Sequence, residues 1–152
     1  MSINQLNVLT SFSKLAETLL GQIKTELSLE SLELYTDSYD QPIYPGLWFW
    51  EMGTQVEDQE QFTIVQLSLK YKTSGTWNGK RIRQLFLNKL GLSHRTQTPR
   101  TYWDFYNEVQ DAPGERVGKM RVEPVDGQLW KQTPENDPTL KHDLLRLKIF
   151  YD

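Results

Sequence analysis

Two segments of the sequence alternate apolar and polar residues, as strands do when one face of their sheet is buried and the other faces solvent. Residues 63–71, TIVQLSLKY, alternate apolar and polar side chains, and residues 144–151, LLRLKIFY, repeat this near the end of the chain. Successive side chains of a strand point to opposite faces, so each segment has one apolar face. The residues on this largely apolar face are Thr63, Val65, Leu67, Leu69, Tyr71, Leu145, Leu147, Ile149 and Tyr151. We expect both strands in one sheet that helices cover on this face.

Two further segments have the spacing of amphipathic helices. Apolar residues recur every three or four positions over residues 2–27, and again over residues 79–90. Gly91 suits the left-handed conformation that often follows a helix. Thr76 or Asn78 would cap the start of the second helix, because their side-chain oxygens can accept a backbone N–H bond. These helices are the natural cover for the sheet.

The remaining segments are shorter or irregular. Residues 32–36 and 46–52 read as short strands on either side of a proline loop, whereas residues 93–138 contain five prolines and predict irregular hairpins and loops. With 152 residues the chain has room for one core. We therefore expect a single α+β domain over residues 1–152, with a mixed or antiparallel sheet and two helices packed on one face.

Composition narrows the class of protein. Seventeen basic residues stand against 20 acidic ones, a net charge of −3, which argues against a protein that mainly grips nucleic acid. No cysteine is present, so thiolate catalysis and cysteine zinc sites are excluded. The opening MSINQLNVLTSF lacks the pattern of a secretion signal, and no apolar run approaches the length of a membrane span. We expect a soluble protein of the cytoplasm that binds no membrane.

The turn SGTWNGKR, residues 74–81, is the segment that most resembles a phosphate-binding loop. Such a loop requires G-x-x-x-x-G-K followed by Ser or Thr. Ser74 occupies the first glycine position and Arg81 replaces the hydroxyl residue. A strand-to-helix turn explains Gly79 without a nucleotide.

Other chemistry finds little support in the spacing of residues. His94 and His142 are not spaced as paired metal ligands, and His142 with Asp143 fits a surface pair at the start of the last strand. No nucleophile elbow is present. The basic run KRIR, residues 80–83, with the aromatic residues of 102–106 leaves nucleic-acid binding as an alternative. We expect no enzyme, no cofactor and no metal.

Tryptophan is more frequent than one small core needs. Five tryptophans lie in five different segments. Because tryptophan is enriched at protein interfaces, some of these side chains are expected at subunit contacts. Trp103 and Trp130, in the irregular segment, are the candidates for exposed interface aromatics.

The order of elements resembles the tail terminator, or tail completion, proteins of long-tailed bacteriophages. The segments that carry the resemblance are residues 2–27, LELYTDSYDQPIYPGLWFW (32–50), FTIVQLSLKYKTSGTWNGKRIRQLFLNKLG (62–91) and HDLLRLKIFYD (142–152). The resemblance implies a structural protein of the virion, assembled in the host bacterial cytoplasm as a hexameric ring. Such a ring ends tail-tube growth and joins the tail tube protein to the neck and head connector.

One hypothesis about surfaces follows from this resemblance. The dense acidic run is VEDQE, with Glu57, Asp58 and Glu60. In a ring through which DNA slides without specific binding, acidic groups avoid tight phosphate contacts. These three residues are therefore the candidate lumen-facing or tube-facing loop, and a solvated loop on the outer rim is the alternative. Another phage neck or head-completion protein, and a monomeric ligand-binding module or small enzyme, remain the alternative functions.

Overall fold

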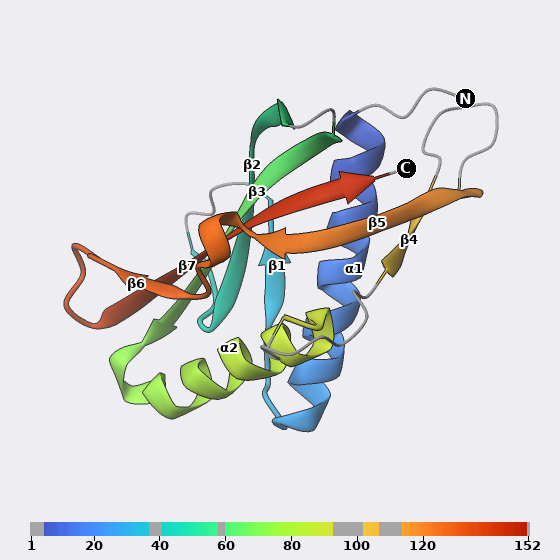
Figure 1. Ribbon diagram of the computed structural model, residues 1–152. Helices are drawn as coiled ribbons and strands as arrows, with labels where there is room; N and C mark the ends of the chain where they lie inside the picture. The colour runs from blue at the N-terminus through green and yellow to red at the C-terminus, as the bar shows by residue number, and fades with distance from the viewer. Residues whose placement is uncertain (1–4, 37–40, 58–59, 93–101, 107–113, 152) are drawn as a thin grey trace.

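A computed structural model of the chain describes residues 5–36, 41–57, 60–92, 102–106 and 114–151 (Figure 1). Two α-helices, seven strands and two short 3₁₀ segments make up this part of the chain. In chain order they are α1 (Gln5–Glu26), β1 (Glu33–Tyr35), β2 (Gly46–Glu57), β3 (Glu60–Lys72), η1 (Thr73–Gly75), α2 (Thr76–Leu90), β4 (Tyr102–Tyr106), β5 (Arg116–Pro124), η2 (Val125–Gly127), β6 (Lys131–Thr133) and β7 (Leu140–Tyr151).

The strands form one mixed sheet in the order β1-β2-β3-β7-β5-β4, and β6 pairs with β7 beside β5. Only β1 and β2 are parallel; the other pairs within the described residues are antiparallel. The predicted partnership of the two patterned strands is confirmed, since β3 and β7 are direct neighbours. Their register aligns Val65 with Leu147 and Leu67 with Leu145, so the two apolar faces coincide.

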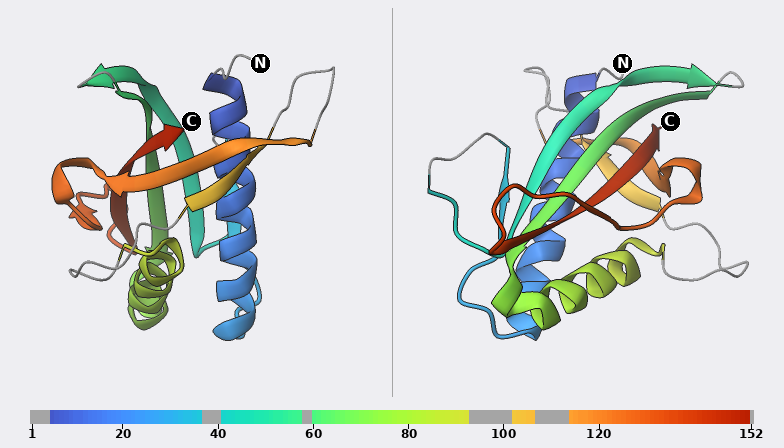
Figure 2. Two further views of the ribbon diagram at one scale, coloured as in Figure 1. Left: turned by 45° about the vertical axis from the view of Figure 1, so that its right-hand side comes forward. Right: turned by 90° about the vertical axis from the view of Figure 1, so that its left-hand side faces the viewer.

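Both helices pack on this shared apolar face, as the amphipathic patterns predicted. Buried side chains of α1, including Phe12, Leu20 and Ile23, join those of α2, such as Ile82 and Phe86, in one hydrophobic core with the inner residues of β3 and β7. The sheet curls, so that α1 contacts β1 at one edge and β4 at the other (Figure 2). The α+β class and the helix arrangement are thus as expected.

The boundaries of several elements differ from the expected ones. Strands β2 and β3 are longer than predicted and pair as far as Glu57 and Glu60. Helix α2 begins at Thr76, so Asn78 lies inside it and neither residue caps it: Gly75 holds the cap position, and the Thr76 hydroxyl donates instead to the carbonyl oxygen of Thr73 at 2.7 Å. Gly91 does adopt the left-handed conformation, with φ of 77°.

The second face of the sheet is less uniformly polar than the alternation suggested. Ser68 and Phe62 both point to this face, and both are buried. Aromatic rings there lie under cationic side chains: the Lys70 ammonium is 5.6 Å from the Trp48 ring centre, and the Lys148 ammonium is 4.8 Å from that of Phe62. The aliphatic stems of these long side chains can cover apolar surface while the charge stays solvated, which explains how the face hides aromatics.

Candidate functional site

Where β3 leads into α2, the helix backbone at Gly79 packs closely against the ring of Tyr71. A Cβ atom added at Gly79 would lie 2.6 Å from the ring of Tyr71, closer than any normal contact. Gly79 lies in the first turns of α2, and Tyr71 lies on the inner face of β3. The glycine therefore lets the helix backbone rest on a buried aromatic ring. This packing accounts for the glycine of the phosphate-loop-like segment.

Beneath this turn, three elements meet at a buried carboxylate. The Tyr71 hydroxyl donates a hydrogen bond of 2.6 Å to Oδ2 of Asp143, and a guanidinium nitrogen of Arg83 lies 3.4 Å from Oδ1. Asp143 is fully buried, which corrects the expected surface pair of His142 and Asp143. Its position was readable from the alternation, because residue 143 shares the face of residues 145, 147 and 149.

The protonation of Tyr71 follows from this environment. Burial, followed by the hydrogen bond to Asp143, raises the pKa of Tyr71 to about 12. The phenol is therefore neutral and able to donate at ordinary pH. Tyr71 is 3% exposed and Asp143 is 0% exposed, so the hydrogen bond that joins β3 to β7 is buried. The partly exposed Arg83 links α2 to the same carboxylate.

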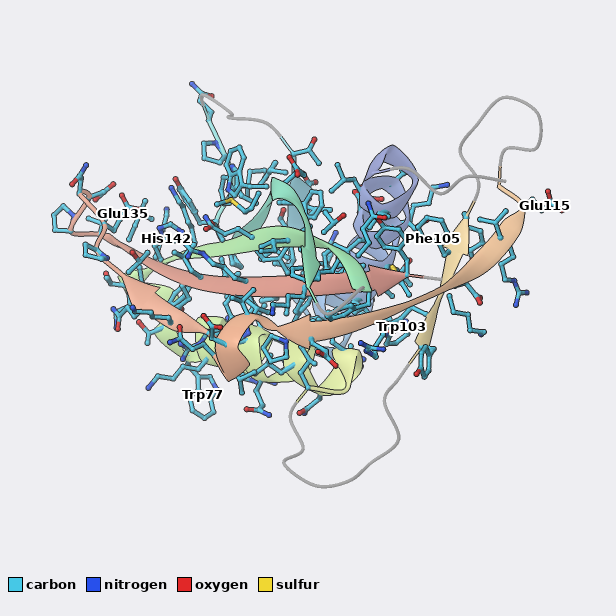
Figure 3. The ribbon with its side chains drawn as sticks, turned by 45° about the horizontal axis from the view of Figure 1, so that its top comes forward. Trp77, Trp103, Phe105, Glu115, Glu135 and His142 are labelled. Atoms are coloured by element: carbon cyan, nitrogen blue, oxygen red, sulfur yellow. The ribbon has the colours of Figure 1, made fainter. Side chains whose placement is uncertain are left out.

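The opposite face of the same sheet end holds a second polar cluster. Lys70 and His142 are cross-strand partners, and Glu135 lies 3.6 Å from the Lys70 ammonium and 4.0 Å from Nδ1 of His142. Burial, and then the charge of Lys70, lower the pKa of His142, although Glu135 and Asp143 act in the other direction. The imidazole is consequently neutral near pH 7. Figure 3 shows His142 and Glu135 at the same end of the molecule.

Surface depressions flank α1 on both sides. A groove of about 390 Å³ runs between α1 and β4 and is lined by Lys14, Leu15, Trp103 and Tyr106 among others. A shallower one of about 510 Å³ lies between α1 and the outer edge of β2. Among the residues that the structure describes, no three carboxylate or histidine side chains gather as a metal site would need.

The candidate acidic residues lie at the turn between β2 and β3. The backbone of Glu57 pairs with that of Glu60 at the tip of this hairpin. Asp58 lies outside the described residues, as do the side chains of Glu57 and Glu60. The hairpin ends at Glu57 and Glu60, where the strand pattern places a loop at one end of the sheet. That the acidic groups face a lumen or the tail tube stays a prediction.

The candidate interface aromatics are less exposed than expected. Trp103 and Trp130 are half-buried and pack against the core. The Trp130 indole N–H donates to the Arg83 carbonyl oxygen at 3.1 Å, and its ring meets Phe86 edge-on. Trp77 is the exposed tryptophan instead, with 71% of its surface accessible. The helical period could have identified it, because Trp77 lies nine residues before Phe86, roughly 180° around the helix.

Comparison with known proteins adds no assignment. No protein-family model matches the chain, and a search of curated proteins found no significant match. In the part of the chain that the structure describes, neither helix is both long and apolar enough to cross a membrane.

Proposed function

We propose that this chain is a bacteriophage structural protein of the tail terminator type. In this role six copies form a ring that caps the tail tube and joins it to the head-neck connector, and the protein resides in the virion after assembly in the bacterial cytoplasm. The observation that carries the proposal is the arrangement of elements. The segments that resemble tail terminators fold together into one curled sheet with both helices on one face.

The long hairpin of β2 and β3 gives the proposed ring a projecting part. Strand β1 pairs with β2 only over Gly46–Trp48, whereas β2 continues to Glu57. Strand β3 stays paired with β7 as far as Phe62, so only the tip of the hairpin, residues 56–57 and 60–61, extends past the neighbouring strand (Figure 2). A projecting hairpin tip with acidic residues suits a surface that faces the lumen or the tail tube, since like charge keeps the DNA phosphates from binding.

A monomeric ligand-binding module is the second candidate, and the groove between α1 and β4 favours it. That groove has a volume of about 390 Å³, within the range of small-molecule sites. Its lining combines the apolar Leu15 and Trp103 with the charged Lys14 and Asp104.

Solution mass, followed by electron microscopy, separates the two candidates. We expect the purified chain, alone or with its tube protein, to sediment at six times the 17.9 kDa of one chain and to appear as rings in negative stain. A species that stays at 17.9 kDa at every concentration, with and without tail tubes, would contradict the ring. The ligand-binding alternative predicts that single-chain mass.

A further inference from the structure

The outer surface of α2 carries positive charge that the molecule itself does not neutralise. The helix contains four basic residues and no acidic one. Two of the four form ion pairs within the molecule, Arg83 with Asp143 and Lys89 with Glu26. Lys80 and Arg81 are exposed and form no ion pair with any residue that the structure describes. The helix dipole adds further positive potential at this end of α2.

Trp77 extends this basic surface with a large apolar ring. It lies three and four residues before Lys80 and Arg81, so the three side chains share one side of the helix. The indole is 71% exposed, and Figure 3 shows it pointing away from the body of the protein. Tryptophan and arginine are both enriched in protein-binding hot spots, and Trp77 and Arg81 supply one of each. We call Trp77, Lys80 and Arg81 the basic stripe.

A surface with complementary character lies after α1. In residues 26–34, ELSLESLEL, the exposed Glu30 and Glu33 have no ion-pair partner within the described part of the chain. On either side of these two residues in the sequence, the half-buried Leu27, Leu29 and Leu34 leave part of their aliphatic surface at solvent. We call residues 26–34 the acidic segment. It offers anions for Lys80 and Arg81, and apolar surface for the indole.

The acidic segment is held in place by its own backbone. The N–H of Leu27 donates to the Ile23 carbonyl oxygen at 2.9 Å, and that of Leu29 donates to the Lys24 carbonyl oxygen at 3.0 Å. Ser28 between them has a positive φ of 51°. This is the hydrogen-bonded, left-handed ending common to helices, so the segment is presented in one conformation and loses little entropy on binding.

Within one molecule the two surfaces are kept apart. The Lys89–Glu26 ion pair of 2.6 Å fixes the acidic segment beside the last turn of α2. Trp77 precedes Lys89 by twelve residues, which corresponds to roughly 18 Å along the helix axis. Figure 1 likewise shows the start of α2 and the connection between α1 and β1 at separate places on the base of the molecule. Each surface therefore needs a second molecule to be covered.

We propose that the basic stripe of one copy docks onto the acidic segment of the next copy. The contact is head-to-tail, since two different surfaces meet, and a head-to-tail contact repeats from copy to copy, giving a ring where the rotation between copies closes and an open chain where it does not. This docking would join neighbouring subunits of the proposed ring, and it rests on the proposed function only for the closure into a ring.

Charge reversal on both sides tests this contact. The first variant carries Lys80→Glu and Arg81→Glu, the second carries Glu30→Lys and Glu33→Lys, and a third carries Trp77→Ala alone. We expect the first two to sediment as single chains at concentrations at which the wild type assembles. Equal mixing of the two should restore assembly, because every contact in an alternating chain then pairs opposite charges. Trp77→Ala should weaken association about thirtyfold, as loss of a hot-spot tryptophan does.

The control reverses the same charge elsewhere: Lys119→Glu with Lys131→Glu, both exposed and outside the two surfaces, should assemble like the wild type. Unchanged thermal melting of every variant shows that folding is intact.

Wild-type assembly by the first two variants would overturn the docking contact and leave the ring standing. Stripe-dependent open chains or dimers would support the contact and overturn the ring. A wild type that is always monomeric, or whose stripe binds only another protein, would overturn the docking contact.

Discussion

Gly79 is required by the packing of the helix backbone and not by a bound ligand. A methyl group there would sit 2.6 Å from the Tyr71 ring, and that ring is held by its bond to the buried Asp143. We expect Gly79→Ala to lower the free energy of unfolding by about 1–3 kcal/mol, as overpacking a core does. Chemical denaturation with urea measures the change.

Gly21 provides the matched control for this substitution. It also lies inside a helix, but an added Cβ would meet no atom within 4 Å. Gly21→Ala should therefore raise the free energy of unfolding by about 0.5–1 kcal/mol, because alanine favours the helix more than glycine does. Equal effects of the two substitutions would contradict the packing explanation of Gly79.

His142 makes the stability of the fold depend on pH. Burial and the neighbouring Lys70 lower its pKa in the folded protein below the ordinary value of 6.5. At pH values between the folded and unfolded pKa, the unfolded chain binds more protons, so acid favours unfolding. The free energy of unfolding should consequently fall as the pH drops from 6.5 towards the lowered pKa, and change no further from this residue below it.

Replacing the imidazole with a group that does not titrate isolates this contribution. We expect His142→Gln to flatten the decline of the unfolding free energy below pH 6.5. Thermal melting across a pH series in one buffer system measures it. The difference between the variant and the wild type should be constant above that range. A variant with the same pH slope as the wild type would assign the decline to other groups.

At the scale of elements, β7 organises the sheet. It pairs with β3 on one side and with β5 and β6 on the other. Leu147 is fully buried between Val65 and Pro124 of the neighbouring strands, whereas Arg146 is exposed and donates a 3.1 Å bond to Gln66. Leu147→Ala should cost about 2–4 kcal/mol of unfolding free energy, through lost burial and the cavity left behind.

Arg146→Ala is the control for this strand, and we expect it to change the unfolding free energy by no more than about 0.5 kcal/mol. The two positions are adjacent, so they share the backbone environment and differ in the face they occupy. Denaturant unfolding of both variants provides the comparison. Similar costs at the two positions would contradict the assignment of inner and outer faces.

The spacing of apolar residues predicted those elements that bury one apolar face in the core. Strands β3 and β7 and both helices were foreseen because their alternation records which side is buried. Strands β4, β5 and β6 were expected only as irregular hairpins, because prolines interrupt the alternation over residues 93–138; in the structure β4 pairs with β5, and β5 and β6 pair with β7. The cap of α2 was missed because the Thr76 hydroxyl bonds to a carbonyl oxygen instead of the helix N–H groups.

The candidate surfaces were predicted less well than the fold. Periodicity alone places Trp77 outside the core stripe of α2, yet Trp103 and Trp130 were preferred because prolines surround them. Their burial comes from contacts between distant segments, such as Trp130 with Arg83. The closed Tyr71–Asp143 pair likewise joins residues 72 positions apart. A sequence pattern predicts which face of its element a side chain occupies. Which distant segment packs over that side chain is seen only in the folded structure.

At the scale of the whole molecule, the proposed subunit contacts and the hairpin tip proposed to face the lumen lie at different ends. The basic stripe and the acidic segment lie near the base, where α1 ends and α2 packs, whereas the β2–β3 hairpin extends from the other end (Figure 1). This separation lets subunit contacts and lumen contacts be altered independently. In the proposed ring, a change at the hairpin tip should therefore leave assembly intact while affecting what passes through the lumen.

Replacing Glu57, Asp58 and Glu60 with Lys is the sharpest test of the hairpin. If the tip faces the lumen, each ring gains cations along the DNA path, and counterion release makes DNA bind them. We expect normal ring mass but slowed DNA passage in assembled particles, followed by dye fluorescence, with the delay shrinking as salt is raised. The neutral variant, with Gln at the same three positions, should show a much smaller delay. Passage at the wild-type rate in the Lys variant would place the tip on the outer rim, where solvated acids touch no DNA.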